Sequence, residues 1–144
     1  MNAPAVDISV SDQVRSVRAR STTVTELVTR VRTAIEAREP ELEAWVQLSS
    51  SASAEAAGID NDQRDLPLSG ISVGVKDLID VEGMPTRAGS SVTPSTAATS
   101  DAPCVARLRA LGAVVQGKTV TTEFGYFRPA PPVTRARSTT PPAG

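Results

Sequence analysis

The sequence predicts an α/β fold, with N-terminal helices followed by the beginning of a mostly parallel mixed sheet that helices cover. Residues 71–76 and 113–116 are short runs rich in Val and Ile, the composition of buried strands. A helical apolar pattern over residues 101–111 lies between them, and strand, helix, strand is the order of a parallel βαβ unit. Aromatic residues make up only 3% of the chain, so aliphatic side chains must fill the core.

A long helix is predicted to begin after Thr23. Thr23 and Glu26 have the spacing of a capping box, in which the hydroxyl and the carboxylate satisfy free amides of the first turn. Pro40 is expected to close the helix. Residues 1–20 are polar and lack a sustained period, which predicts a tail or an irregular helix. The apolar stripe of the long helix consists of Val24, Leu27, Val28, Val31 and Ile35.

The segments between this helix and the strand at 71–76 carry weaker patterns. Residues 42–48 alternate imperfectly and predict a short strand. Residues 51–59 are rich in Ala and predict a short helix that ends near Gly58, followed by a solvated connection at 61–65. Within the strand that follows, the small residue Gly74 leaves room for close approach by another segment.

The second half of the βαβ unit contains clear boundary signals. Residues 83–100 form a long loop rich in Gly, Ser, Thr and Pro, and such loops are usually functional or disordered. Asp101 is expected to cap the next helix, with Pro103 in its first turn. Gly112 is expected to end that helix, and Gly117 to turn the chain out of the following strand. The buried face of the helix is predicted to be Val105, Leu108 and Leu111.

The composition excludes several classes of function. The chain has no histidine and a single cysteine, which excludes His-based nucleophilic catalysis, an internal disulfide and a plausible structural zinc site within it. A formal net charge of -1 with interspersed signs argues against direct binding of nucleic acid. Neither a membrane-spanning run nor a secretory signal is evident, so we expect a cytoplasmic protein. No cofactor is expected.

Two local patterns have a functional and a structural interpretation. Residues 112–119 match the phosphate-loop pattern G-x-x-x-x-G-K-[ST], but a helix precedes Gly112 and the interior residues favour a strand, which argues against nucleotide binding. Cys104 lies near a predicted helix start that could stabilise a thiolate. Without a histidine to activate it, a buried structural role is the better interpretation of Cys104.

Lys76 is the candidate catalytic residue. It ends the strand at 71–76, and open α/β sheets bind their ligands at the carboxyl ends of strands. A partly buried lysine at such a position can lose its proton and act as a base. The alternative is a lysine that stays charged because the nearby Asp77 and Asp80 pair with it, and position alone favours this alternative.

Two longer segments change that balance. Residues 66–90 read LPLSGISVGVKDLIDVEGMPTRAGS, and residues 101–119 continue with DAPCVARLR and GAVVQGKT before Thr122-Glu123-Phe124. In order and spacing these segments resemble the lysine-bearing part of amidase-signature enzymes, a family that includes the aspartyl/glutamyl-tRNA amidotransferases through their amidase component. The resemblance covers most of the chain. Val120 stands where such enzymes commonly carry asparagine, which is a departure from the pattern.

The resemblance implies a Ser-cisSer-Lys mechanism for hydrolysing a small-molecule amide. In that mechanism Lys76 would be neutral in the resting site and would relay a proton from a bridging serine that activates the nucleophilic serine. Neither serine can be assigned in this chain. Ser138 is not a candidate, because no glycine-rich backbone surrounds it. We therefore expect an amide hydrolase fragment, incomplete relative to the full amidase fold and inactive by itself.

The resulting division of the chain has three parts. Residues 1–20 are the N-terminal tail or irregular helix, 21–127 a partial amidase-signature domain, and 128–144 a disordered Pro-rich tail, for which a frameshift near residue 130 is a hypothesis. The alternative function is a non-catalytic interaction module that uses an exposed sheet edge. Exposed edges also predict self-association, and no membrane partner is expected.

Overall fold

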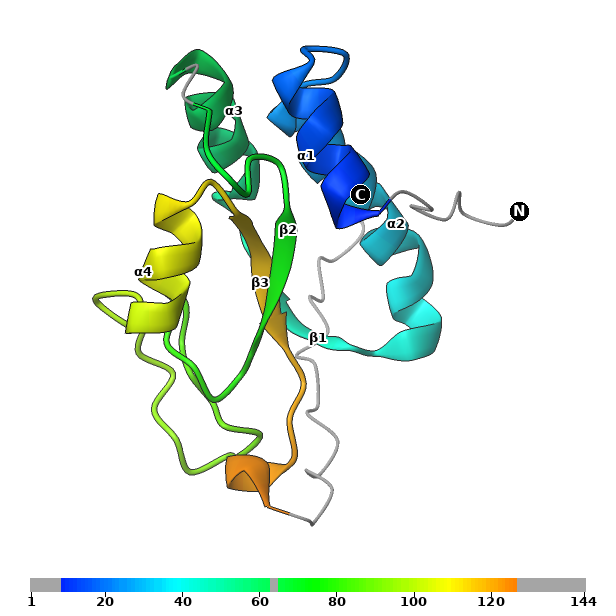
Figure 1. The fold of residues 1–144 in the computed structure, drawn as a ribbon. Helices are drawn as coiled ribbons and strands as arrows, with labels where there is room; N and C mark the ends of the chain where they lie inside the picture. The colour runs from blue at the N-terminus through cyan, green and yellow to red at the C-terminus, as the bar shows by residue number, and fades with distance from the viewer. Residues whose placement is uncertain (1–8, 63–64, 127–144) are drawn as a thin grey trace, which may run out of the picture.

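A computed structural model of the chain describes residues 9–62 and 65–126 (Figure 1). In chain order the elements are α1 (Val10–Arg18), α2 (Val24–Leu42), β1 (Trp45–Leu48), α3 (Ala52–Asp62), β2 (Ser72–Lys76), α4 (Pro103–Ala110), β3 (Val114–Thr119) and the short 3-10 helix η1 (Glu123–Gly125). Among the described residues, no helix is long and apolar enough to cross a membrane. The Pro-rich segment 128–144, predicted to be disordered, lies outside these residues.

The sheet is mixed, as the sequence predicts. Its strand order is β1-β3-β2, with β2 parallel and β1 antiparallel to the central strand β3. The chain leaves β2, passes through the long loop and α4, and returns as β3, which is the expected βαβ crossover. The carboxyl ends of β2 and β3 therefore lie at the same edge of the sheet, where Lys76 is paired in register with Thr119.

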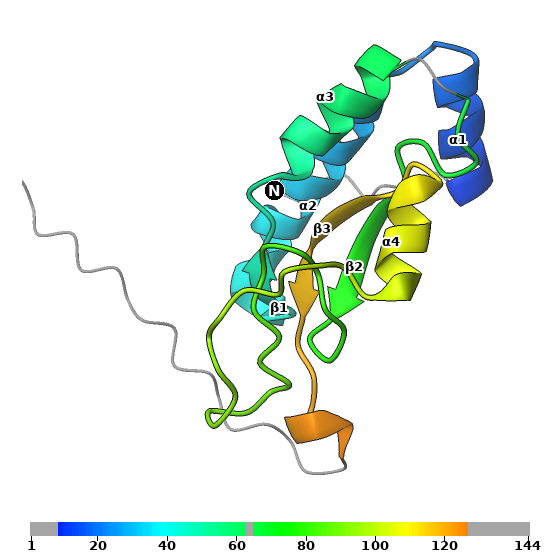
Figure 2. The same cartoon turned by 90° about the vertical axis from the view of Figure 1, so that its left-hand side faces the viewer.

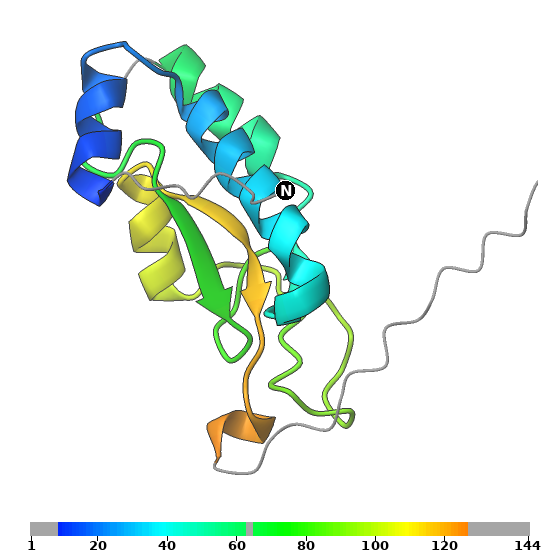
Figure 3. The same cartoon turned by 90° about the vertical axis from the view of Figure 1, so that its right-hand side faces the viewer.

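Helices cover both faces of the sheet, and side chains of β3 alternate between two cores. Val114 packs with α2 and α3 on one face, whereas Val115 packs with α4 and the loop after β2 on the other. Figures 2 and 3 show the strands between α2 and α3 on one side and α4 on the other. Aliphatic and Ala side chains make up nearly all of both cores, with Met84 as the exception, as the scarcity of aromatic residues requires.

The predicted capping box of α2 is confirmed, but Pro40 does not end the helix. The Thr23 side chain accepts from the Glu26 amide, and the Glu26 carboxylate accepts from the Thr23 amide at 2.8 Å. Pro40 lies in the last turn, and the helix continues to Leu42. The helix ends two residues later, where the Glu39 carboxylate accepts from the amides of Ala44 and Trp45 as the chain turns into β1.

Asp60 gives α2 a second cap from another helix. Its carboxylate accepts from the amides of Val24 at 2.8 Å and Thr25 at 3.0 Å, and from the Thr25 hydroxyl at 2.7 Å. Burial opposes ionisation of Asp60, but these hydrogen bonds outweigh it and lower the pKa of its carboxyl below the ordinary 3.8. The carboxylate thus joins the end of α3 to the start of α2.

Several predicted boundaries are wrong for identifiable reasons. The segment before residue 20 contains a regular helix, α1, whose N-cap Ser9 accepts from the Asp12 amide. Helix α3 runs through Gly58 to Asp62, because its apolar face continues to pack on α2 beyond the glycine. Strand β3 likewise runs through Gly117 to Thr119.

Asp101 is not the N-cap of α4. That position belongs to Ala102, which makes no side-chain cap, while Pro103 lies in the first turn as expected. Asp101 instead accepts from the Glu82 amide at 2.8 Å and lies 3.0 Å from the Arg109 guanidinium. It therefore ties the long loop to the helix. Of the predicted buried face of α4, Val105 is buried, and Leu108 and Leu111 are partly buried.

Candidate functional site

Lys76 ends β2 at the carboxyl edge of the sheet, and its neighbours point in the opposite direction. Val75 and Asp77 are buried, whereas Lys76 between them is exposed, as the alternation of an extended chain requires. No hydrogen bond or ion pair joins Lys76 Nζ to another residue of the described segments. The partial burial that the sequence argument expects for Lys76 is therefore not provided by these segments, and its catalytic role stays a prediction.

The described residues also lack the ion pair that would keep Lys76 charged. Asp80 is exposed and has no ion pair to Lys76 within the part of the chain that the structure describes. Asp77 is fully buried and pairs with a different lysine: its Oδ1 lies 2.9 Å from Lys118 Nζ, and both side chains are 0% exposed. Asp77 is thus held away from Lys76 by an interaction in the interior.

A β-bulge explains how Lys118 reaches Asp77. Val73 pairs with Val115 but Gly74 pairs with Gly117, so Gln116 is an extra residue in β3. Beyond this residue the alternation of β3 is reversed, and Lys118 pairs in register with Val75, which belongs to the core beneath α4. The bulge therefore directs the Lys118 side chain toward the loop that follows β2.

Gly117 follows the bulge and lies very close to β1, where there is no room for a side chain. A Cβ at residue 117 would lie 2.2 Å from the Gln47 carbonyl oxygen and 2.8 Å from Leu48 Cα. Its φ of +155° also favours glycine. The glycine that the sequence suggests as a turn is instead the contact between the central strand and β1. Gly74, by contrast, fulfils its prediction: a Cβ there would lie 2.9 Å from the Trp45 ring.

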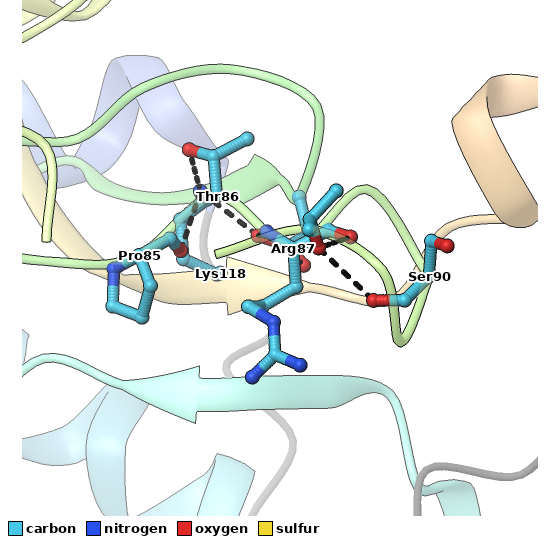
Figure 4. Close-up of polar contacts among 7 residues, drawn as sticks. Pro85, Thr86, Arg87, Ser90 and Lys118 are labelled. Carbon is cyan, nitrogen blue, oxygen red and sulfur yellow. Dashed lines mark hydrogen bonds and ion pairs between the residues drawn. The ribbon is translucent and has the colours of Figure 1, made fainter. Parts of the chain in front are cut away.

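The buried pair also holds the first part of the long loop (Figure 4). Lys118 Nζ donates to Thr86 Oγ1 at 2.9 Å and to the Pro85 carbonyl at 3.4 Å. The Arg87 amide donates to both carboxylate oxygens of Asp77, at 3.3 and 3.2 Å. Residues 85–87 are therefore bound to two strand ends through a single pair of charges.

The next residues of the loop continue this network toward the end of β3. The Ala88 amide donates to the Asp77 carbonyl at 2.9 Å, and the Ala88 carbonyl accepts from the Phe124 amide at 2.8 Å. Ser90 is buried, and its hydroxyl donates to the Glu123 carboxylate at 2.7 Å. The loop therefore bridges β2 and the η1 segment along the edge at which Lys76 lies.

The structure argues against the phosphate-loop interpretation and corrects that of Cys104. Most of the matching segment is strand β3, and Lys118, the lysine of the pattern, is fully buried and paired, so it cannot reach a phosphate. Cys104 is exposed in α4 and not buried. One cavity lies at the opposite end of the sheet, lined by residues of α1, α2 and α3 such as Val17 and Asp60, and Lys76 does not line it.

Sequence reasoning missed the Asp77–Lys118 pair, although a signal for it was present. Lys118 follows a run of buried residues within a strand, and a charge there needs a buried partner of opposite sign. Asp77 is the obvious acid, because β2 and β3 end at the same edge.

Comparison with known proteins identifies the family to which this arrangement belongs. The family model for amidase matches residues 26–140. The chain belongs to the amidase family. A putative amidase, AmiA2, of Mycobacterium tuberculosis is 42% identical over 125 residues, which are 83% of this chain and 25% of that protein. An amidase of Pseudomonas putida is 36% identical over 86% of this chain and 27% of its own length.

A solved structure agrees with this assignment. The peptide amidase of Stenotrophomonas maltophilia superposes with a TM-score of 0.78 at 35% identity, over 85% of this chain and 26% of that enzyme. The chain thus spans about a quarter of the length of the relatives that it matches.

Proposed function

We propose that this chain carries the lysine of an amide-hydrolysing site, and that Lys76 moves a proton during cleavage of a carboxamide C–N bond. The supporting observation is that Lys76 Nζ has no carboxylate partner among the described residues, because Asp77 is paired with Lys118. A lysine that works as a base must spend part of its time neutral, and a carboxylate in contact would oppose that. Its place at the carboxyl end of a parallel strand is also where α/β folds bind ligands.

In this proposal Lys76 accepts a proton from a bridging serine, which accepts one from the serine that attacks the amide carbonyl. The proton then passes to the nitrogen of the leaving amine, and water releases the acyl group from the enzyme. Neither serine is assigned within the 144 residues, so we propose that the chain alone does not hydrolyse amides. The desolvation that would favour a neutral Lys76 must come from segments other than the described ones, since they leave it exposed.

A chimaera tests the role of Lys76. The matching segment of the Stenotrophomonas peptide amidase is replaced with residues 26–126 of this chain, and hydrolysis of a simple peptide amide is measured. Lys76→Ala is expected to lower kcat by about 10²- to 10⁴-fold, the usual contribution of a general acid–base. Lys76→Arg keeps the charge but cannot give up its proton, so it should be as inactive as the alanine variant. An active arginine variant would contradict proton transfer by Lys76.

The intact chain provides a second test. It should show no hydrolysis of simple amides above background, and turnover that disappears in Lys76→Ala would refute the inactivity proposed for the chain alone.

A binding function has separate support from exposed apolar side chains at the same edge. Val120, Phe124 and Tyr126 are 50%, 48% and 74% exposed, and β2 is an edge strand of the sheet that the described residues form. Such a surface favours association with another polypeptide or with a second copy of the chain. Sedimentation velocity over a range of concentrations tests this: a sedimentation coefficient that stays at the monomer value would count against self-association.

A further inference from the structure

The Asp77–Lys118 pair anchors the chain directly beside Lys76. Asp77 directly follows Lys76, and each of its polar groups is bound: its amide donates to the Thr119 carbonyl at 3.0 Å, its carbonyl accepts from Ala88, and its carboxylate accepts from Lys118 and Arg87. A residue with main chain and side chain both anchored cannot rotate. The peptide that it shares with Lys76 is therefore held in one orientation.

We infer that Asp77 and Lys118 are positioning residues for Lys76. Their buried pair holds the end of β2 and residues 85–88 as one block, and it keeps the Asp77 carboxylate from neutralising Lys76 Nζ. This inference rests on the proposed role of Lys76 as a proton carrier. The positioning itself is a property of the folded chain, and it can be measured without any catalysis.

Lys118 keeps the Asp77 carboxylate away from Lys76 because it satisfies that charge in the interior. A buried carboxylate needs a partner, because an isolated charge in the interior is very costly. If Lys118 were absent, the nearest cation in sequence would be Lys76, one residue away. Turning Asp77 outward would supply that partner and would hold the Lys76 proton in an ion pair. Lys118 prevents this by satisfying Asp77 inside the protein, at 2.9 Å.

The same pair holds the loop at residues 85–88 against the ends of β2 and β3. Among the described residues, the Thr86 side chain reaches the strands through a single hydrogen bond, the one between its hydroxyl and Lys118. The amides of Arg87 and Ala88 then bind Asp77. Loss of the Thr86 hydroxyl should therefore loosen the neighbouring loop amides, although Thr86 itself makes no hydrogen bond to them.

Amide hydrogen exchange of the intact chain tests the loop. Thr86→Val removes the hydroxyl while nearly preserving the shape, and Thr86→Ser keeps it. We expect the valine variant to exchange faster at Arg87 and Ala88 by about ten-fold or more, the ratio for loss of a hydrogen bond to a charged group. The serine variant should match the wild type. Val28→Ala, in the core on the other face of the sheet, is the control for general destabilisation.

Acylation of lysine tests the charge argument. Lys76 and Lys118 are the only lysines of the chain, and Lys118 is fully buried, so an N-hydroxysuccinimide ester followed by peptide mass spectrometry reports on Lys76. In Lys118→Met the released Asp77 carboxylate should pair with Lys76 and slow its acylation several-fold. In the double variant Asp77→Asn/Lys118→Met the rate should return to that of the wild type.

Two results would overturn the inference. One is exchange at Arg87 and Ala88 in Thr86→Val that equals exchange in Val28→Ala at the same global stability. The other is equal acylation of Lys76 in the single and double Lys118 variants. Neither measurement involves turnover, so a chimaera that stays active with Lys76→Arg would refute the proposed function and leave these results standing.

Discussion

Substitutions in the buried Asp77–Lys118 pair should change the free energy of unfolding by amounts that depend on whether one charge or both are removed. Asp77 and Lys118 lie 2.9 Å apart, with both side chains 0% exposed. Asp77→Asn removes one charge and keeps an oxygen that can still accept from the Arg87 amide. Lys118→Met removes the other charge at similar length. Each single change breaks the buried pair and takes away the partner of the remaining charge, and the double change removes both charges.

The expected free energies follow from this difference. Breaking a buried ion pair by removing one partner costs about 3–5 kcal/mol, which is a large part of the roughly 5–15 kcal/mol by which a domain is stable. Replacing both partners with neutral groups of similar volume is often nearly neutral. We therefore expect each single variant to lose about 3–5 kcal/mol and the double variant to lose less than either one.

Urea unfolding followed by fluorescence of Trp45, the only tryptophan, measures these free energies. Its ring lies against Gly74 of β2, so the signal reports on the strand that carries the site. Arg18 and Asp65 form an exposed pair at 2.6 Å. Single and double variants of that pair, compared in the same way, should give a coupling energy below about 1 kcal/mol. If the losses of unfolding free energy in Asp77→Asn and Lys118→Met sum to the loss in the double variant within about 0.5 kcal/mol, the reasoning is refuted, since additivity means that the two groups do not interact.

Three further outcomes are expected. Gly117→Ala should lower the free energy of unfolding by more than about 3 kcal/mol, because its Cβ would lie 2.2 Å from the Gln47 carbonyl oxygen. Gly58→Ala, whose Cβ would have nothing within 4 Å, should instead raise it by about 0.5–1 kcal/mol. Thermal melts of both variants measure the difference. The pKa of Asp60 is lowered below 3.8 in the folded protein, so its contribution to stability is complete above that pH and is lost as the pH falls through the folded-state pKa. The difference in stability between the wild type and Asp60→Asn should therefore become smaller in acid. An unchanged difference at pH 2 would contradict the capping role. Lys76 should be acylated in the native protein while the other lysine reacts only after urea is added, and equal labelling of both in buffer would contradict the described burial.

Prediction from sequence succeeds here where the interactions are local. The capping box at Thr23 and Glu26 connects residues three positions apart, and the alternation of β2 depends only on the period of an extended chain. The position of Lys76 at the carboxyl end of a strand follows from the βαβ order. These features need no knowledge of what packs against them.

Prediction fails where a distant segment decides the outcome. Pro40 and Gly58 are local breaking signals, but α2 continues to Leu42, after which Glu39 satisfies the next amides, and α3 continues because Ile59 packs on the core that α3 shares with α2. The role of Gly117 depends on the backbone of β1, about seventy residues earlier in the chain. No pattern within a strand reveals such a contact.

The sequence by itself determined the α/β class, the order of the elements, the family resemblance and the placement of Lys76 at a strand end. Only the tertiary structure decided which acid belongs to which lysine. Lys76 and Asp77 are adjacent in sequence but point to opposite faces, whereas the extra residue in β3 turns Lys118 toward Asp77. The physical reason is that a buried charge must find its partner in space, and the register between two strands determines which groups meet there.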